Sequence, residues 1–190
     1  MYIISLDVQR KLLKLYRKAG KGEFGAWIYS KNSYVDVYDE TVFYSTGLLI
    51  RLQDLRLMLR SAMVDRSKII GFVHSHPETT LKLPAIMNFS PNDLFTILRI
   101  VGFVLENYVP ENMWDKVSPL FLLVIPDFIC WIMFYDLLEC RKEVVDWLID
   151  HMFIASALDI IHYYRELERE GFIKTGGSRL GEKDIVLSWS

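Results

Sequence analysis

The sequence predicts an α/β fold, an α+β mixed sheet with flanking helices. In several segments apolar residues recur every three or four positions, which is typical of amphipathic helices. Other segments are short runs of β-branched and aromatic residues, which favour strands. The segments follow one another in the order helix, strands, helix, strand, helix, strands, and this order favours helices packed on a sheet.

The first half of the chain is expected to begin with an amphipathic helix over 7–19, which Gly20 ends. The polar face of this helix is basic. We interpret it as a solvated face, with an anionic membrane surface as the alternative partner. Runs of apolar and β-branched residues then predict strands at 23–29, 34–38, 42–46 and 68–74, with a helix from 52 to 65 before the last strand.

The second half is expected to open with a polar loop over 77–89 and a helix from Pro91 to about residue 107. Two buried strands, 120–125 and 128–135, flank a turn at Pro126-Asp127. The remaining chain is predicted as one long helix from 141 to about 170, a glycine stop at 171, a flexible turn at 176–177 and a short strand at 185–189.

Composition excludes some classes of function. Apolar residues make up 52% of the chain, and its mean hydropathy is +0.19, yet the uncharged runs within 118–140 are far shorter than the roughly 18 residues that a spanning helix needs. The N-terminus has no signal-peptide pattern. The 22 basic and 24 acidic residues give a formal net charge of −2, without the positive excess of nucleic-acid binders. We therefore expect a cytoplasmic protein without membrane or nucleic-acid partners.

Four residues that could carry chemistry are interpreted as structural. Cys130 and Cys140 match no CxxC pattern, so we expect small buried hydrophobes. His151 and His162 lie about three helical turns apart with no carboxylate pattern joining them.

The most informative stretch is His74-Ser75-His76-Pro77, at the end of the strongest predicted strand. Side chains two residues apart in a strand share one face, so both imidazoles point into the same space. Two neutral imidazoles are half of a typical zinc coordination set. An H-x-H pair alone is weak evidence, because buried histidines often only satisfy hydrogen bonds.

A second stretch, Ser90-Pro91-Asn92-Asp93, is explained locally as the start of a helix, with Ser90 as N-cap and Asp93 in the first turn. The same helix could bring Asp93 to the histidine pair. Two imidazoles and one carboxylate leave a fourth zinc position open for water, as in catalytic sites. Ser90 would then lie near the developing oxyanion.

Hydrolysis by such a site also requires a general base. Glu23 begins an otherwise apolar predicted strand, where a carboxylate is out of keeping with its neighbours. Glu40 and Glu78 are alternatives, but both are in polar segments and are interpreted as solvated.

Together, Glu23, His74-Ser75-His76-Pro77 and Ser90-Pro91-Asn92-Asp93 resemble the signature of the JAMM (MPN-type, Jab-domain) zinc metalloproteases, over roughly residues 1–135. The resemblance implies a cytidine-deaminase-like architecture and a Zn²⁺ ion bound by His74, His76 and Asp93. It further implies that Glu23 is the general base and that Ser90 helps to stabilise the tetrahedral intermediate.

The chain departs from the family pattern at two places. Thirteen residues separate His76 from Ser90, more than is usual in the family, although a longer loop costs little free energy. Gly25 also lies one residue nearer to Glu23 than the corresponding glycine often does.

The resemblance divides the chain into a JAMM/MPN-like metalloprotease domain over 1–140 and a C-terminal helical extension over 141–190, with a short terminal strand. The function it implies is zinc-dependent hydrolysis of a peptide or isopeptide bond after a ubiquitin-like or sulfur-carrier protein. A non-catalytic scaffold of the same fold and a RadC-like protein associated with DNA repair are the alternatives. The apolar surplus of the extension suggests a homodimer or a larger complex formed through its helix.

Overall fold

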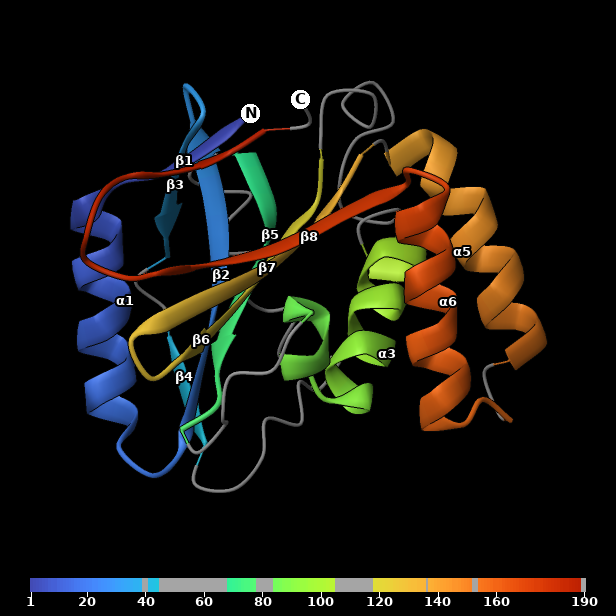
Figure 1. Ribbon diagram of the computed structural model, residues 1–190, viewed down its shortest axis with the longest axis horizontal. Coiled ribbons are helices and arrows are strands. Elements are labelled where there is room, and N and C mark those ends of the chain that lie inside the picture. The colour runs from blue at the N-terminus through green and yellow to red at the C-terminus, as the bar shows by residue number, and fades with distance from the viewer. Residues whose placement is uncertain are drawn as a thin grey trace. The chain divides into compact units, whose positions relative to one another are not determined.

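The computed structural model describes residues 1–38, 41–44, 68–77, 84–104, 118–135, 137–151 and 154–188. Within these residues the fold is mixed α/β, as predicted. The described strands form one sheet in the order β8-β7-β6-β5-β2-β3-β1-β9, and β4 also pairs with β2 (Figure 1).

The chain divides into two interleaved compact units. Unit 1 contains residues 1–88, 121–131 and 176–190, and unit 2 contains residues 89–120 and 132–175. Each unit therefore draws on segments that are far apart in the sequence. A single domain boundary after residue 140, expected from the extent of the resemblance, stays a prediction.

Unit 1 begins with β1 (Tyr2–Ile4), a strand that the sequence did not predict, and with helix α1 (Leu6–Ala19). The Ser5 side chain caps α1 by accepting a hydrogen bond from the Val8 amide, and Gly20 ends the helix at a φ of +62°. The helix is confirmed, and both of its ends lie within one residue of the predicted ends. Its apolar residues pack against β2 and β3, and Leu12 is fully buried.

Strand β2 (Glu23–Lys31) lies at the centre of unit 1. It pairs antiparallel with β3 (Tyr34–Val37) and β4 (Val42–Tyr44), and also with β5 (Lys68–Ser75). The pairing between β2 and β5 sets Gly25 opposite His74. These strands confirm the four predicted in the first half of the chain, except that residues 45–46 are outside the described residues.

Two further predicted strands, β6 (Leu120–Ile125) and β7 (Phe128–Phe134), are also confirmed. Asp127 has a φ of +57° in the two-residue turn that joins them. Every residue of β6 is buried, so this hairpin accounts for part of the apolar surplus noted in the composition.

The flexible turn predicted at Gly176-Gly177 is wrong, because both glycines lie inside strand β8 (Ile173–Arg179). A Cβ added at Gly176 would lie 2.4 Å from the Trp131 ring, and one added at Gly177 would lie 2.6 Å from the Phe128 ring. Glycine is needed here so that the backbone can pass close to two aromatic rings of β7.

The single long helix predicted over 141–170 is also wrong. Two helices occupy this region, α5 (Leu137–His151) and α6 (Ala157–Arg169). Ser156 and Asp159 form a capping box that begins α6, and a capping box is a strong local signal for a new helix. The predicted stop at Gly171 is confirmed by its φ of +82°.

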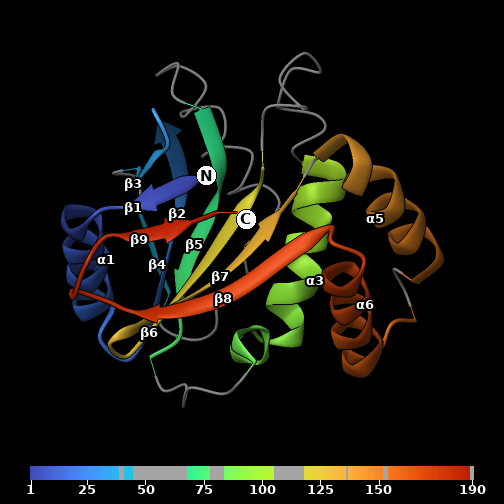
Figure 2. The ribbon, with the colours of Figure 1, turned by 45° about the horizontal axis from the view of Figure 1, so that its top comes forward.

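Helix α3 (Pro91–Arg99) continues into a π-helical turn, η2 (Ile100–Val104), and the rest of the helix predicted to 107 is outside the described residues. In unit 2, α3 packs against α5 and α6 (Figure 2). The loop predicted before α3 contains a short 3-10 helix, η1 (Ala85–Asn88).

The terminal strand predicted at 185–189 is present as β9 (Ile185–Leu187), which pairs antiparallel with β1. The helix predicted over 52–65, as well as Glu40 and Glu78, are outside the described residues. None of the described helices has both the length and the apolar character required to cross a bilayer.

Candidate metal centre

The two predicted histidine ligands lie at the C-terminal end of β5. His74 is buried at 5% exposure, and His76 follows the last residue of the strand. The His76 amide donates a hydrogen bond to the Val124 carbonyl of β6 at 3.0 Å. The two rings face the same space, with centroids 5.0 Å apart, as the H-x-H spacing predicted.

The third predicted ligand, Asp93, lies in the first turn of α3 and is half-buried. Its Oδ2 atom accepts a hydrogen bond from the Ser90 amide at 2.7 Å. The Ser90 Oγ atom in turn accepts from the Asp93 amide at 3.2 Å. With Pro91 in the first turn, these two bonds form the capping box that the local interpretation of this stretch predicted.

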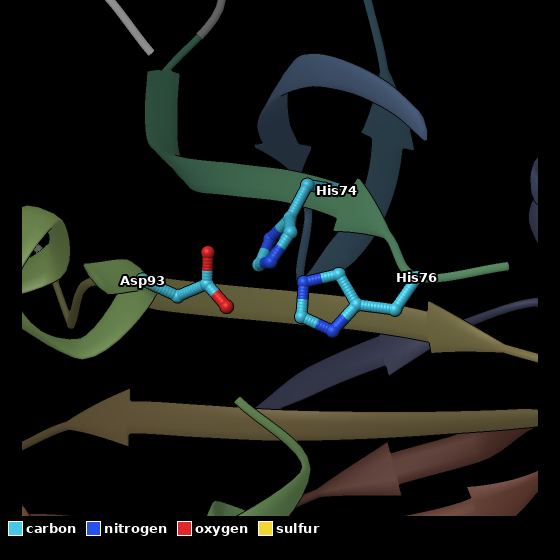
Figure 3. A group of neighbouring side chains, drawn as sticks. All are labelled: His74, His76 and Asp93. Carbon is cyan, nitrogen blue, oxygen red and sulfur yellow. The ribbon is translucent and has the colours of Figure 1, made fainter. Parts of the chain in front are cut away.

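His74, His76 and Asp93 form a group that could hold a metal ion. Each offers one ligand atom, and these atoms all lie within 4.8 Å of one another. The Asp93 carboxylate and both imidazoles point toward a common space (Figure 3). The sequence alone singled out these three residues as metal ligands.

The donor set of two nitrogens and one oxygen fits zinc. Zinc bonds to histidine and carboxylate are about 2.0–2.2 Å long, so two ligands of one ion lie no more than about 4 Å apart. The ligand atoms here lie within 4.8 Å of one another.

Glu23, the predicted general base, is the first residue of β2 and is half-buried. Gly25 lies opposite His74 in the register of β2 and β5, and opposed residues project from the same face of a sheet. Glu23 is two residues before Gly25, so it also shares the face of His74. Its role as a base stays a prediction.

Tyr16 is a residue near the histidines that the sequence analysis missed. Its hydroxyl donates a hydrogen bond to the carbonyl of Pro77 at 3.0 Å, which anchors the chain directly after His76. Burial and the nearby carboxylate of Asp127 both raise the pKa of Tyr16, which keeps the donating proton in place. No local signal could have found this contact, because 61 residues separate its partners.

The residues interpreted as structural have structural contacts. His151 stacks on Trp147 and hydrogen-bonds its carbonyl at 2.9 Å, while His162 is 3.3 Å from Glu166. Cys130 and Cys140 are buried thiols, and burial raises the pKa of Cys130 to about 11. At neutral pH the Cys130 thiol is therefore protonated and a poor nucleophile.

No family model matches this chain, and no curated protein matches it either.

Proposed function

We propose that this protein is a zinc-dependent hydrolase of the JAMM type, which cleaves a peptide or isopeptide bond after a ubiquitin-like or sulfur-carrier protein. One observation carries the proposal. His74, His76 and Asp93 are the ligands that the motif resemblance implies, and they are also the described residues whose ligand atoms lie within 4.8 Å of one another.

The composition of the group supports a catalytic metal site rather than a structural one. Two histidines and one aspartate supply three protein ligands, and catalytic zinc sites commonly have three, whereas structural sites have four. The Ser90 amide holds one oxygen of Asp93, and such outer contacts orient metal ligands. A zinc ion bound there would supply Lewis-acid activation of water and of the scissile carbonyl.

Two residues of the chain would then act directly on the reaction, Glu23 by transferring protons and Ser90 by stabilising negative charge. Glu23 would take a proton from the attacking water and pass it to the amine that leaves when the C–N bond breaks. Ser90 would donate a hydrogen bond to the oxygen that becomes negative in the tetrahedral intermediate. Because water is the nucleophile, neither buried cysteine is required.

The described fold is compatible with the proposal at the level of its general class. Helix α1 precedes the strand that begins with Glu23, and that strand pairs with the strand that carries the histidines. These elements belong to a mixed α/β fold, which is the general class that the motif resemblance implies.

Metal analysis of the full chain, purified without chelator, tests the proposed site. We expect about one zinc ion per wild-type chain and loss of zinc in His74→Ala. His162→Ala, at an exposed histidine of α6, is the matched control and should keep its metal. A folded wild-type protein with no zinc would contradict the proposal and favour the non-catalytic scaffold.

Hydrolysis of a ubiquitin-like protein fused through its C-terminal glycine to a reporter tests the chemistry. Glu23→Gln should keep zinc and lose at least about 100-fold in kcat, because general-base catalysis contributes 10²–10⁴-fold. Glu143→Gln, at an exposed carboxylate of α5, should behave as wild type. Full activity in Glu23→Gln would rule out Glu23 as the base.

A further inference from the structure

The residue between the two histidines, Ser75, joins their strand to the strand of Glu23. Ser75 is fully buried, and its Oγ atom accepts a hydrogen bond from the Phe24 amide of β2 at 2.9 Å. In a strand, the Ser75 side chain projects away from the face that holds the histidines. Its hydroxyl therefore contacts the neighbouring backbone and is not a ligand candidate.

This bond lies where the pairing of β2 and β5 ends. The last paired residues are Gly25 and His74, and one position further on the Phe24 amide meets the Ser75 side chain in place of a backbone carbonyl. The His76 amide is already bonded to the Val124 carbonyl of β6. The Ser75 hydroxyl thus continues the connection to β2 where the paired positions of β2 and β5 end.

The peptide unit held by Ser75 is the one that joins Glu23 to Phe24. The Phe24 nitrogen is bonded directly to the carbonyl carbon of Glu23, and the peptide plane between them is rigid. One hydrogen bond therefore connects the backbone of Glu23 to the backbone between His74 and His76. On the other edge of β2, pairing with Tyr44 of β4 also holds Glu23.

We propose that Ser75 is a positioning residue, which fixes the Glu23 carboxylate relative to the histidine pair. This inference rests on the proposed hydrolase function. A displacement of about 1 Å in a catalytic group can cost about 100-fold in rate. Ser75 would therefore act on kcat through Glu23, while the metal ligands and the substrate contacts stay in place.

Ser75→Ala in the full chain tests the inference by kinetics. We expect a fall in kcat of about 10- to 100-fold with KM and zinc content close to wild type, because Glu23 is misplaced and the ligands are intact. Ser75→Thr keeps a hydroxyl in the strand and should recover most of the activity. Ser30→Ala, at the other end of the same strand pair, is the matched control.

Two further measurements separate positioning from a loss of folding. Hydrogen exchange of the Phe24 amide should become faster in Ser75→Ala and stay slow in Ser75→Thr. Ser75→Cys keeps the side-chain volume but accepts hydrogen bonds weakly, so it should fold and still lose kcat.

The outcomes distinguish this inference from the function it rests on. An active wild-type enzyme together with an unchanged kcat in Ser75→Ala would overturn the role of Ser75 alone. Slow Phe24 exchange in Ser75→Ala would overturn it as well. A wild-type protein that binds zinc but hydrolyses none of the fusions would overturn the proposed function, and this inference with it.

Discussion

The described part of the chain contains two capping boxes of the same pattern, and their surroundings differ. Ser90-Pro91-Asn92-Asp93 begins α3, and Ser156-Ala157-Leu158-Asp159 begins α6. In each, the serine hydroxyl accepts from the aspartate amide, and the aspartate carboxylate accepts from the serine amide. Asp93 is half-buried and belongs to the group with His74 and His76, whereas Asp159 is exposed.

The comparison shows that two aspartates with the same local hydrogen bonds can have different neighbours. Both carboxylates accept a hydrogen bond from a backbone amide at a helix N-terminus, and this role explains an aspartate at each position without any metal. What distinguishes Asp93 is the presence of two imidazoles within reach of its carboxylate. Asp159 therefore serves as an internal control for Asp93.

The largest expected difference is in metal binding by the two aspartate variants. Asp93→Asn should weaken zinc binding by at least about 100-fold, more than the loss of an outer-shell contact, because it removes a charged ligand. Asp159→Asn should leave the zinc affinity at the wild-type value. Competition with a chromophoric chelator measures both, and equal affinities in the two variants would exclude Asp93 as a ligand.

The zinc affinities of the two serine variants should differ less, while their stabilities should change by similar amounts. Ser90→Ala and Ser156→Ala each remove an N-cap and should each lower the free energy of unfolding by about 1 kcal/mol. Only Ser90→Ala should also weaken zinc binding, by about 10-fold, because the α3 cap orients the Asp93 carboxylate. Urea unfolding and chelator competition measure the two effects separately, and similar zinc affinities would show that the α3 cap has no part in metal binding.

The smallest expected effect is the pH dependence of the α6 cap. Hydrogen bonds from Ser156 lower the pKa of Asp159 below its usual value. A carboxyl with a lowered folded-state pKa stabilises the fold above its unfolded pKa of about 3.9, and this contribution is lost as the pH falls through the folded-state pKa. Unfolding curves of wild type and Asp159→Ala should therefore differ at pH 7 and converge in acid. A difference that is constant with pH would mean that the ionised carboxylate contributes nothing.

Much of the fold could be predicted because its signals are local. The boundaries of α1 follow from the Ser5 cap and Gly20, and the apolar runs of β5, β6 and β7 predict buried strands. The prediction failed where a local signal had two explanations. The glycine pair Gly176-Gly177 predicts a turn, although packing against Trp131 and Phe128 explains why glycine is needed there.

The failure at α5 and α6 has a different cause, since the necessary signal was present in the sequence. Ser156 and Asp159 have the same spacing as Ser90 and Asp93, which were recognised as a helix start. The apolar periodicity of the surrounding residues extends through both helices and by itself predicts one long helix, whereas the capping box marks the start of a second helix. When a capping box lies within a segment of helical periodicity, the box is the stronger evidence, and it indicates that a new helix begins there.

By itself the sequence determined which residue types could bind a metal and which side chains share a strand face. The H-x-H spacing sets both histidines on one side of β5, because side chains alternate along every strand. The tertiary structure alone decided that the ligand atom of a helix-capping carboxylate 17 residues beyond His76 lies within 4.8 Å of those of both imidazoles. It alone decided that Ser75 and Tyr16 hold the histidine segment to β2 and α1. Such contacts join residues far apart in the chain, and their partners are fixed by packing, which no local pattern encodes.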